Sequence, residues 1–100
     1  MVKIVALFRK PSDVDLFNDH YRKVHLPLAR KVPGLRKLEI TRTTAAPIGD
    51  ASFFVMAEMY YDSMEALNAS NASPEGRALV KDLMSFAAGI VTVFFGEVED

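Results

Sequence analysis

The sequence predicts one α+β domain in which helices cover one face of a four-stranded antiparallel sheet. The length of 100 residues is that of a single domain with one hydrophobic core, so we assign residues 1–100 to it. Strand-like and helix-like segments follow one another in the order βαββαβ. Three of the four strand-like segments are apolar on both faces, whereas the helical segments carry an apolar stripe on one side only.

The βαββαβ order is that of the ferredoxin-like sandwich. Its first strand is predicted over residues 2–8, a β-rich run that ends at the turn signal of residues 9–11. An amphipathic helix of about five turns follows, with Ser12 as its predicted N-cap. The apolar stripe of this helix consists of Val14, Phe17, Tyr21, Val24 and Leu28.

Pro27 lies inside the predicted helix. Because proline lacks a backbone N–H and clashes with the preceding turn, we expect a kink near His25 and Leu26, after which Pro27 opens a final helical turn. The helix is expected to end at residues 32–34, which contain a proline followed by a glycine.

The second and third strands are predicted over residues 35–43 and 53–60, with a loop over residues 44–52 between them. The second strand alternates imperfectly, with Leu38 and Ile40 on one face and charged residues between them. It is therefore expected to be the more exposed of the two.

A helix start with acidic residues is predicted at residues 62–65, and the chain is expected to loosen at residues 68–71. Ser73 is predicted to cap a second helical piece, which has a proline at its first position. Gly89 is predicted to end that helix, and residues 90–95 to form the fourth strand.

The two-faced strands predict a homodimer. In the first strand Val5 and Leu7 are apolar on one face, and Ile4, Ala6 and Phe8 are apolar on the other. Two helical segments cover only one face, and monomers rarely expose the apolar patch that would remain. A second copy packed on the open sheet face by two-fold symmetry would cover it. The alternative is a monomer in which long side chains or the tail cover that face.

The composition excludes several classes of function. Twelve basic and thirteen acidic residues give a net charge of −1, without the basic stripe of a nucleic-acid-binding protein. No apolar run approaches the roughly 20 residues that cross a bilayer, and the first segment does not resemble a signal peptide. With no cysteine, thiol catalysis and cysteine-ligated metals are excluded. We expect a soluble, cytoplasmic protein that binds neither nucleic acid nor membranes.

Both histidines, His20 and His25, lie on the first predicted helix. On an ideal helix they flank the apolar stripe on opposite sides, roughly 140° apart. Their spacing of five also differs from the i, i+4 spacing of a helical metal pair. We therefore predict no metal site, and we assign His20 to the surface or to the flank of the helix.

His25 and Tyr21 are the predicted catalytic residues. They stand four residues apart, so the phenol and the imidazole lie on neighbouring parts of one helix face. A neutral histidine accepts or donates a proton near pH 7, and a tyrosine hydroxyl orients an oxygen of a ligand. The alternative is that both residues border the core and satisfy one another or the backbone.

Phe17, Met56 and Tyr60 are the predicted walls of a pocket beside this pair. Methionine suits an adaptable pocket wall, and one of Tyr60 and Tyr61 must face inward because side chains alternate along a strand. The alternative for each residue is a place in the core. The sequence contains no glycine-rich phosphate loop, serine elbow or paired-carboxylate motif.

Four short motifs along the chain are similar to those of a known family. They are Phe17-x3-Tyr21-x3-His25-x-Pro27-Leu28, Pro33-Gly34-Leu35, Tyr61-Asp62-Ser63-Met64-Glu65-Ala66-Leu67 and Ser73-Pro74-Glu75-Gly76. With these motifs nearly the whole chain resembles the EthD-like proteins, a branch of the dimeric α/β-barrel superfamily. The resemblance implies a βαββαβ fold, a dimer whose sheets pack face to face, and a cavity between helix and sheet near His25.

The resemblance also bears on activity. Related branches of the superfamily include cofactor-free oxygenases of aromatic polyketides, lactone isomerases and polyketide cyclases. Their pockets use His, Tyr or Asn to handle protons. The chain has no tryptophan, and it lacks the Asn and Trp that mark the small quinone-forming monooxygenases.

Two functional hypotheses follow. In the first the protein is a cofactor-free enzyme that transfers a proton on a small apolar or aromatic carbonyl or phenolic compound, with His25 as base or acid and Tyr21 as the orienting group. In the second it is a non-catalytic small-molecule binder or accessory protein, in which both residues hold the helix against the sheet. A cavity of a few hundred Å³ beside His25 would favour the enzyme, and a filled core would favour the second hypothesis.

Overall fold

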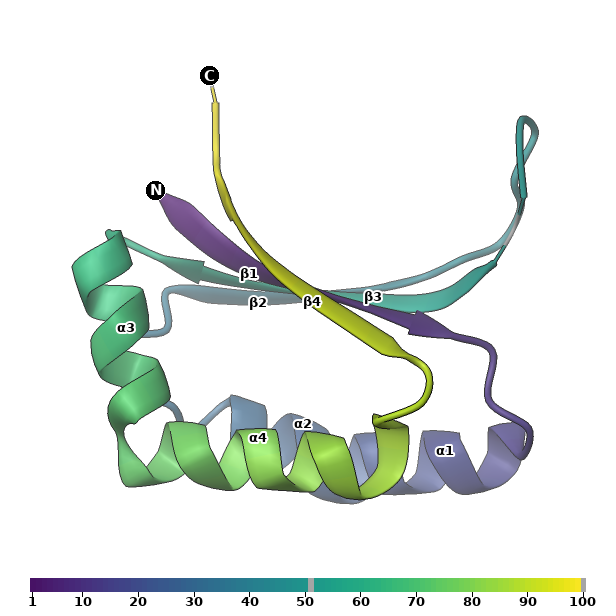
Figure 1. Ribbon diagram of the computed structural model, residues 1–100, viewed down its shortest axis with the longest axis horizontal. Coiled ribbons are helices and arrows are strands. Elements are labelled where there is room, and N and C mark those ends of the chain that lie inside the picture. Colours follow the sequence, from purple (N-terminus) through teal and green to yellow (C-terminus); the bar gives the residue numbers. More distant parts are fainter. Residues whose placement is uncertain (51, 100) are drawn as a thin grey trace.

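The computed structural model describes residues 1–50 and 52–99 and consists of two layers, a four-stranded antiparallel sheet and a layer of helices on one of its faces (Figure 1). The sheet order is β2-β3-β1-β4. In chain order the elements are β1 (Val2–Arg9), α1 (Val14–His20), the π-helical turn η1 (Tyr21–His25), α2 (Leu26–Ala29), β2 (Lys37–Arg42), β3 (Phe53–Tyr61), α3 (Met64–Ala72), α4 (Pro74–Ala87) and β4 (Val91–Glu97). The predicted βαββαβ order is confirmed.

The helix-facing side of the sheet forms the hydrophobic core. Ala6 in β1 pairs with Ala57 in β3 and with Val93 in β4, and strand alternation then places Ile4 and Phe8 on the same face. Phe8 is fully buried in this core. The two layers therefore meet over β1, which, like β3, pairs with a strand on each side.

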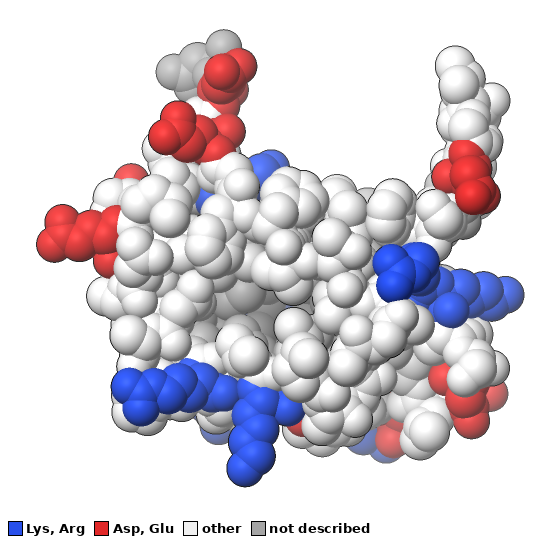
Figure 2. Space-filling model, in the orientation of Figure 1, with Lys and Arg blue, Asp and Glu red and all other residues white. Residues whose placement is uncertain are grey.

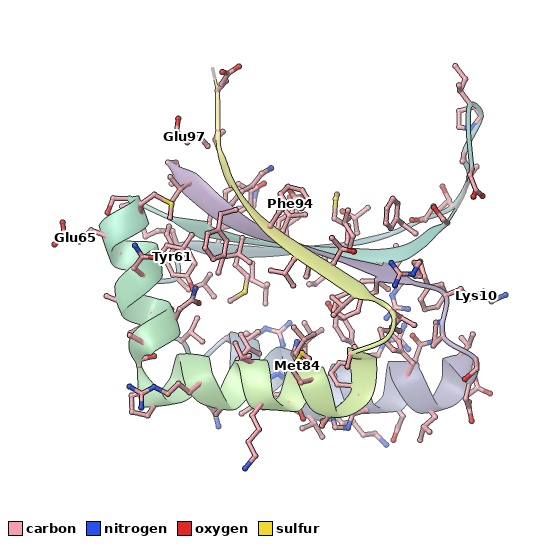
Figure 3. All side chains as sticks on the ribbon, in the orientation of Figure 1. Lys10, Tyr61, Glu65, Met84, Phe94 and Glu97 are labelled. Atoms are coloured by element: carbon pink, nitrogen blue, oxygen red, sulfur yellow. The ribbon has the colours of Figure 1, made fainter. Side chains whose placement is uncertain are left out.

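In the described part of the chain, no helix covers the opposite face of the sheet (Figure 1). Its side chains near one end of β1 are polar, where Lys3 pairs with the buried carboxylate of Glu58. Along the rest of the strand they are apolar, and Leu7 lies between Met56 and Thr92 on the neighbouring strands. Phe94 is 47% exposed, and Figure 3 shows it on the side of the sheet away from the helices. This open face is the one on which we expect a second copy.

The first helix changes its geometry before Pro27. Its N-cap is Asp13, whose side chain accepts a hydrogen bond from the backbone N–H of Leu16, so the prediction of Ser12 as the cap is wrong by one residue. The helix then widens into η1, where the N–H of Leu26 donates to the carbonyl of Tyr21, five residues back. Pro27 follows in the first turn of α2, where a backbone N–H is not needed, so the expected irregularity takes the form of a π turn.

The second helical region is more continuous than predicted. We expected residues 68–71 to loosen, but α3 runs on to Ala72 because Leu67 and Ser70 are buried. The Ser70 hydroxyl makes a 2.8 Å hydrogen bond with the hydroxyl of Tyr61, which faces the helices. Ser73 caps α4 as predicted, accepting from the N–H of Gly76.

Smaller differences concern the ends of elements. The second strand is shorter than predicted, and β4 begins one residue later and extends two residues further. The predicted loop over residues 44–52 includes position 51, which lies outside the described residues. Within the described part of the chain, every helix is too short or too polar to cross a membrane.

Candidate functional site

A cavity of about 280 Å³ lies between the helices and the sheet. Its floor is formed by β1 and β3, where small side chains such as Ala6 and Ala57 leave space. Leu79 and Leu83 of α4 line it from the helix layer. Almost all of the lining is apolar, and the polar side chains that reach it are those of Tyr21, His25 and Asn71.

The cavity opens between β4 and α4. Val80 and Met84 on α4, and Val93 and Phe95 on β4, all line the cavity and are each about half exposed. Figure 2 shows a hollow in this face of the molecule, surrounded by uncharged residues. The opening is therefore apolar, which favours ligands with little charge.

His25 reaches the cavity from η1 and is held by Asp82 of α4. Its Nδ1 lies 2.9 Å from Oδ2 of Asp82, so Nδ1 carries the proton and donates it to the carboxylate. In the neutral ring Nε2 is then unprotonated and is able to accept a proton. The pKa of His25 is lowered by burial, which outweighs the opposing effect of the Asp82 carboxylate. His25 is thus kept in the neutral form, which can accept a proton, at the edge of an apolar cavity.

His20 contacts the same carboxylate. Its Nε2 lies 2.9 Å from Oδ1 and 3.1 Å from Oδ2 of Asp82. The prediction that the two histidines lie on opposite sides of the helix is wrong, because the π turn adds one residue to the helical turn between them. Both rings therefore turn toward α4.

Tyr21 is the second polar group of the cavity. Its ring lies 5.6 Å from the ring of His25, so the structure brings the predicted catalytic pair together. Tyr21 is completely buried, and its hydroxyl has no hydrogen-bond partner within the described part of the chain. Burial raises the pKa of Tyr21 to about 12, with smaller opposing effects of Arg42 and Arg30, so the phenol stays protonated as a donor.

The three predicted pocket walls lie elsewhere. Met56 and Tyr60 alternate with the core residues of β3, so their side chains point to the open face of the sheet. There the hydroxyl of Tyr60 donates to Glu58. The prediction that these two residues line a cavity with His25 is therefore wrong. Phe17 is buried against the rings of Phe8 and Tyr21 and supports the site from behind.

Asp82 is a site residue that the sequence patterns did not predict. It stands on α4 between Leu79 and Phe86, at positions three and four residues from apolar neighbours. An acid inside an apolar helical stripe is a signal, because a buried carboxylate requires partners. The two histidines supply those partners, and within residues 1–50 and 52–99 no group of three metal-ligating side chains is placed to hold a metal ion.

The unpaired hydroxyl of Tyr21 leads to a prediction about stability. A buried hydroxyl without a partner costs about 1–3 kcal/mol, so Tyr21→Phe is expected to raise the free energy of unfolding by about 1 kcal/mol. Tyr61→Phe is the matched control, because the Tyr61 hydroxyl is paired with Ser70 and its removal is expected to lower that free energy by about 1 kcal/mol. Urea denaturation measures both changes, and equal losses in the two variants would contradict an unpaired Tyr21 hydroxyl.

The fold and the cavity define a ferredoxin-like α+β protein with a ligand-sized apolar site between its two layers. The EthD domain family model matches residues 9–90. The chain therefore belongs to the EthD family.

Known proteins support this membership. The crystal structure of an ethyl tert-butyl ether D (EthD) family protein from Bacillus halodurans is 43% identical, with 99% of each chain covered and a TM-score of 0.95. An uncharacterised 11.0 kDa protein from the thcB-thcC intergenic region of Rhodococcus erythropolis is 27% identical, over 99% of this chain and 96% of its own. A dimeric ferredoxin-like protein of unknown function from Thermobifida fusca is 13% identical, with 97% and 90% covered and a TM-score of 0.71, which shows the fold alone.

Proposed function

We propose that the protein is a small enzyme that moves a proton on a partly apolar or aromatic carbonyl or phenolic compound, without a cofactor. His25 is the general base or acid, and Tyr21 is the group that orients and polarises an oxygen of the substrate. The observation that carries this proposal is the buried hydroxyl of Tyr21, which has no hydrogen-bond partner among residues 1–50 and 52–99, beside a histidine that contacts Asp82 through Nδ1.

The chemistry follows from the surroundings of these groups. Because Nδ1 of His25 donates to Asp82, Nε2 is free to take a proton from a carbon or oxygen acid. The negative charge that develops on the substrate oxygen is stabilised by the Tyr21 O–H, which has no competing partner among the described residues. The apolar lining strengthens both interactions because it excludes water. Isomerisation, cyclisation and cofactor-free oxygenation all begin with such a deprotonation.

The alternative function is that of a non-catalytic small-molecule binder. The same cavity and the same unpaired hydroxyl would hold a carbonyl or phenol without reaction. A protein that only retains an apolar ligand does not need a carboxylate that fixes the tautomer of a histidine. His25 has such a carboxylate in Asp82, so we favour the enzyme.

Hydrogen exchange at carbon tests the proposal without knowledge of the natural substrate. In D₂O the wild-type protein is expected to speed deuterium incorporation at the activated methylene of 2-tetralone and of related aromatic ketones, measured by NMR. His25→Ala is expected to reduce that acceleration by about 100-fold or more and to keep the fold. Arg22→Ala, an exposed substitution on the same π turn, is the control and should leave the rate unchanged.

Two outcomes would count against catalysis by His25. If His25→Ala exchanges these ketones as fast as the wild type, the base has been wrongly assigned. If the wild type binds the ketones but leaves their exchange at the buffer rate, the binder is the better description.

We also propose that the protein works as a homodimer through the open sheet face. Phe94 projects from that face and is 47% exposed, and a paired copy would bury it with Leu7 and Met56. Phe94→Glu is therefore expected to convert the dimer to a monomer in light scattering at micromolar concentration. Leu16→Glu places the same charge at an exposed position on α1 and should remain dimeric. A monomeric wild type would refute this assembly.

A further inference from the structure

The carboxylate of Asp82 joins two histidines that face different parts of the molecule. Its Oδ2 lies 2.9 Å from Nδ1 of His25, and its Oδ1 lies 2.9 Å from Nε2 of His20. The three side chains therefore form one continuous chain of hydrogen-bond contacts, from Nε2 of His25 to Nδ1 of His20.

The two ends of this chain open to different spaces. His25 lines the apolar cavity, whereas His20 lines a separate hollow of about 430 Å³ together with Ser12 and Ser85. The side chain of His20 is 31% exposed, while those of His25 and Asp82 are 9% and 13% exposed. The His20 end of the chain is thus the more exposed to solvent, and the His25 end is buried.

Phe86 shields the connection between the two ends. Its ring lies 4.6 Å from the ring of His20 and 5.0 Å from the ring of His25, and it also lines the outer hollow. An aromatic ring at this position limits the access of water to the contacts that Asp82 makes with the two histidines. Protons that pass between the cavity and the hollow would therefore move along these three side chains.

We propose that His25, Asp82 and His20 form a proton relay that connects the buried, apolar His25 end of the cavity to solvent at the hollow between α1 and α4. This inference rests on the proposed function, because the proton carried is the one that His25 exchanges with a ligand. A base in an apolar cavity needs such a path, since the cavity itself offers few groups to receive the proton.

The transfer balances in protons and charge. It starts with His25 neutral and protonated at Nδ1, Asp82 ionised, and His20 protonated at both ring nitrogens. The Nε2 proton of His20 first moves to Oδ1 of Asp82. A proton then enters at Nε2 of His25, the Nδ1 proton of His25 moves to Oδ2, the Oδ1 proton moves to Nε2 of His20, and the Nδ1 proton of His20 leaves to water. At the end all three groups are neutral, and His20 still donates from Nε2 to Oδ1. The reverse sequence restores the starting state, and no electrons are transferred.

The relay can be tested on the unliganded protein, so the outcome does not depend on any turnover. In ¹⁵N-labelled protein the exchange rate of the His25 Nδ1 proton with water is measured by NMR saturation transfer. His20→Gln keeps an N–H donor for Asp82 but cannot pass a proton, and it is expected to slow this exchange by about tenfold or more. The ¹⁵N shifts of His25 should keep the pattern of the Nδ1–H form in both proteins. Lys23→Gln, an exposed change nearby, is the control.

The possible results are distinct. Slower exchange with an unchanged His25 tautomer supports the relay, whether or not the 2-tetralone assay detects catalysis. An unchanged exchange rate in His20→Gln overturns it. A changed tautomer in His20→Gln also overturns it, because His20 would then act by positioning Asp82.

Discussion

Gly76→Ala is expected to lower the free energy of unfolding by about 3 kcal/mol or more. A Cβ atom at this position would collide with the backbone of the preceding helix, overlapping the Ser70 carbonyl and lying 2.9 Å from Cα and 3.0 Å from the carbonyl oxygen of Asn71. Backbone atoms cannot swing aside as a flexible side chain can. The substitution would force α3 and α4 apart at the point where Ser73 ends one helix and caps the next.

Gly89→Ala is the matched control for that change. No atom of the residues that the structure describes lies within 4 Å of a Cβ atom at Gly89, so this variant is expected to stay within about 0.5 kcal/mol of the wild type. Urea denaturation of both variants gives the comparison. Similar stability of the two would mean that the corner between α3 and α4 is looser than the structure shows.

Ala57→Leu is expected to weaken ligand binding strongly while keeping the protein folded. Ala57 lies on β3 in the floor of the cavity, opposite Ala6, so a leucine there would occupy the space that a ligand needs. Filling an apolar cavity also adds contacts, so the melting temperature should stay the same or rise. Titration of 2-naphthol, followed by its fluorescence, is expected to show binding weakened by about 100-fold.

The control for that substitution is Ala78→Leu. Ala78 is exposed on α4, so the same increase in size occurs outside the cavity and should leave 2-naphthol binding intact. If Ala57→Leu binds 2-naphthol like the wild type, the ligand occupies a place other than this cavity.

The order and type of the elements were predictable because local patterns determine them. Apolar residues on both faces of β1 indicated that one face packs on the helices and that the other is free to pack on a second copy. In the structure the helix layer lies on one face of the sheet. The serine cap of α4 was predictable for the same local reason, since Ser73 precedes a proline at the first helical position.

The arrangement of the site was only partly predictable. Helical spacing predicted that Tyr21 and His25 are neighbours, and their rings are 5.6 Å apart. The same spacing failed for His20, because an ideal wheel assumes α-helical geometry and the chain adopts a π turn before Pro27. Asp82 is 57 residues away from His25 in the sequence, so their contact depends on tertiary packing that no local pattern describes.

Tertiary contacts also decided the length of α3. Its polar, weakly helix-forming stretch suggested a loose segment, but the hydrogen bond between Ser70 and Tyr61 and the complete burial of Leu67 hold it in helical form. In β3 the residues next to Met56 and Tyr60 are also largely apolar, so the sequence pattern was compatible with either face for both. The pairing register with β1 places them on the open one.

The π turn at Tyr21–His25 has a consequence for how such a site arises. A π turn contains one residue more than the α-helical turn it replaces, which corresponds to a single-residue insertion in a regular helix. Without that residue, the part of the helix that carries His25 would rotate by about 100° relative to α1, and His25 would lose Asp82 while His20 kept it. A difference of one codon therefore separates a helix with a single histidine–aspartate contact from one that also presents an oriented base to a cavity.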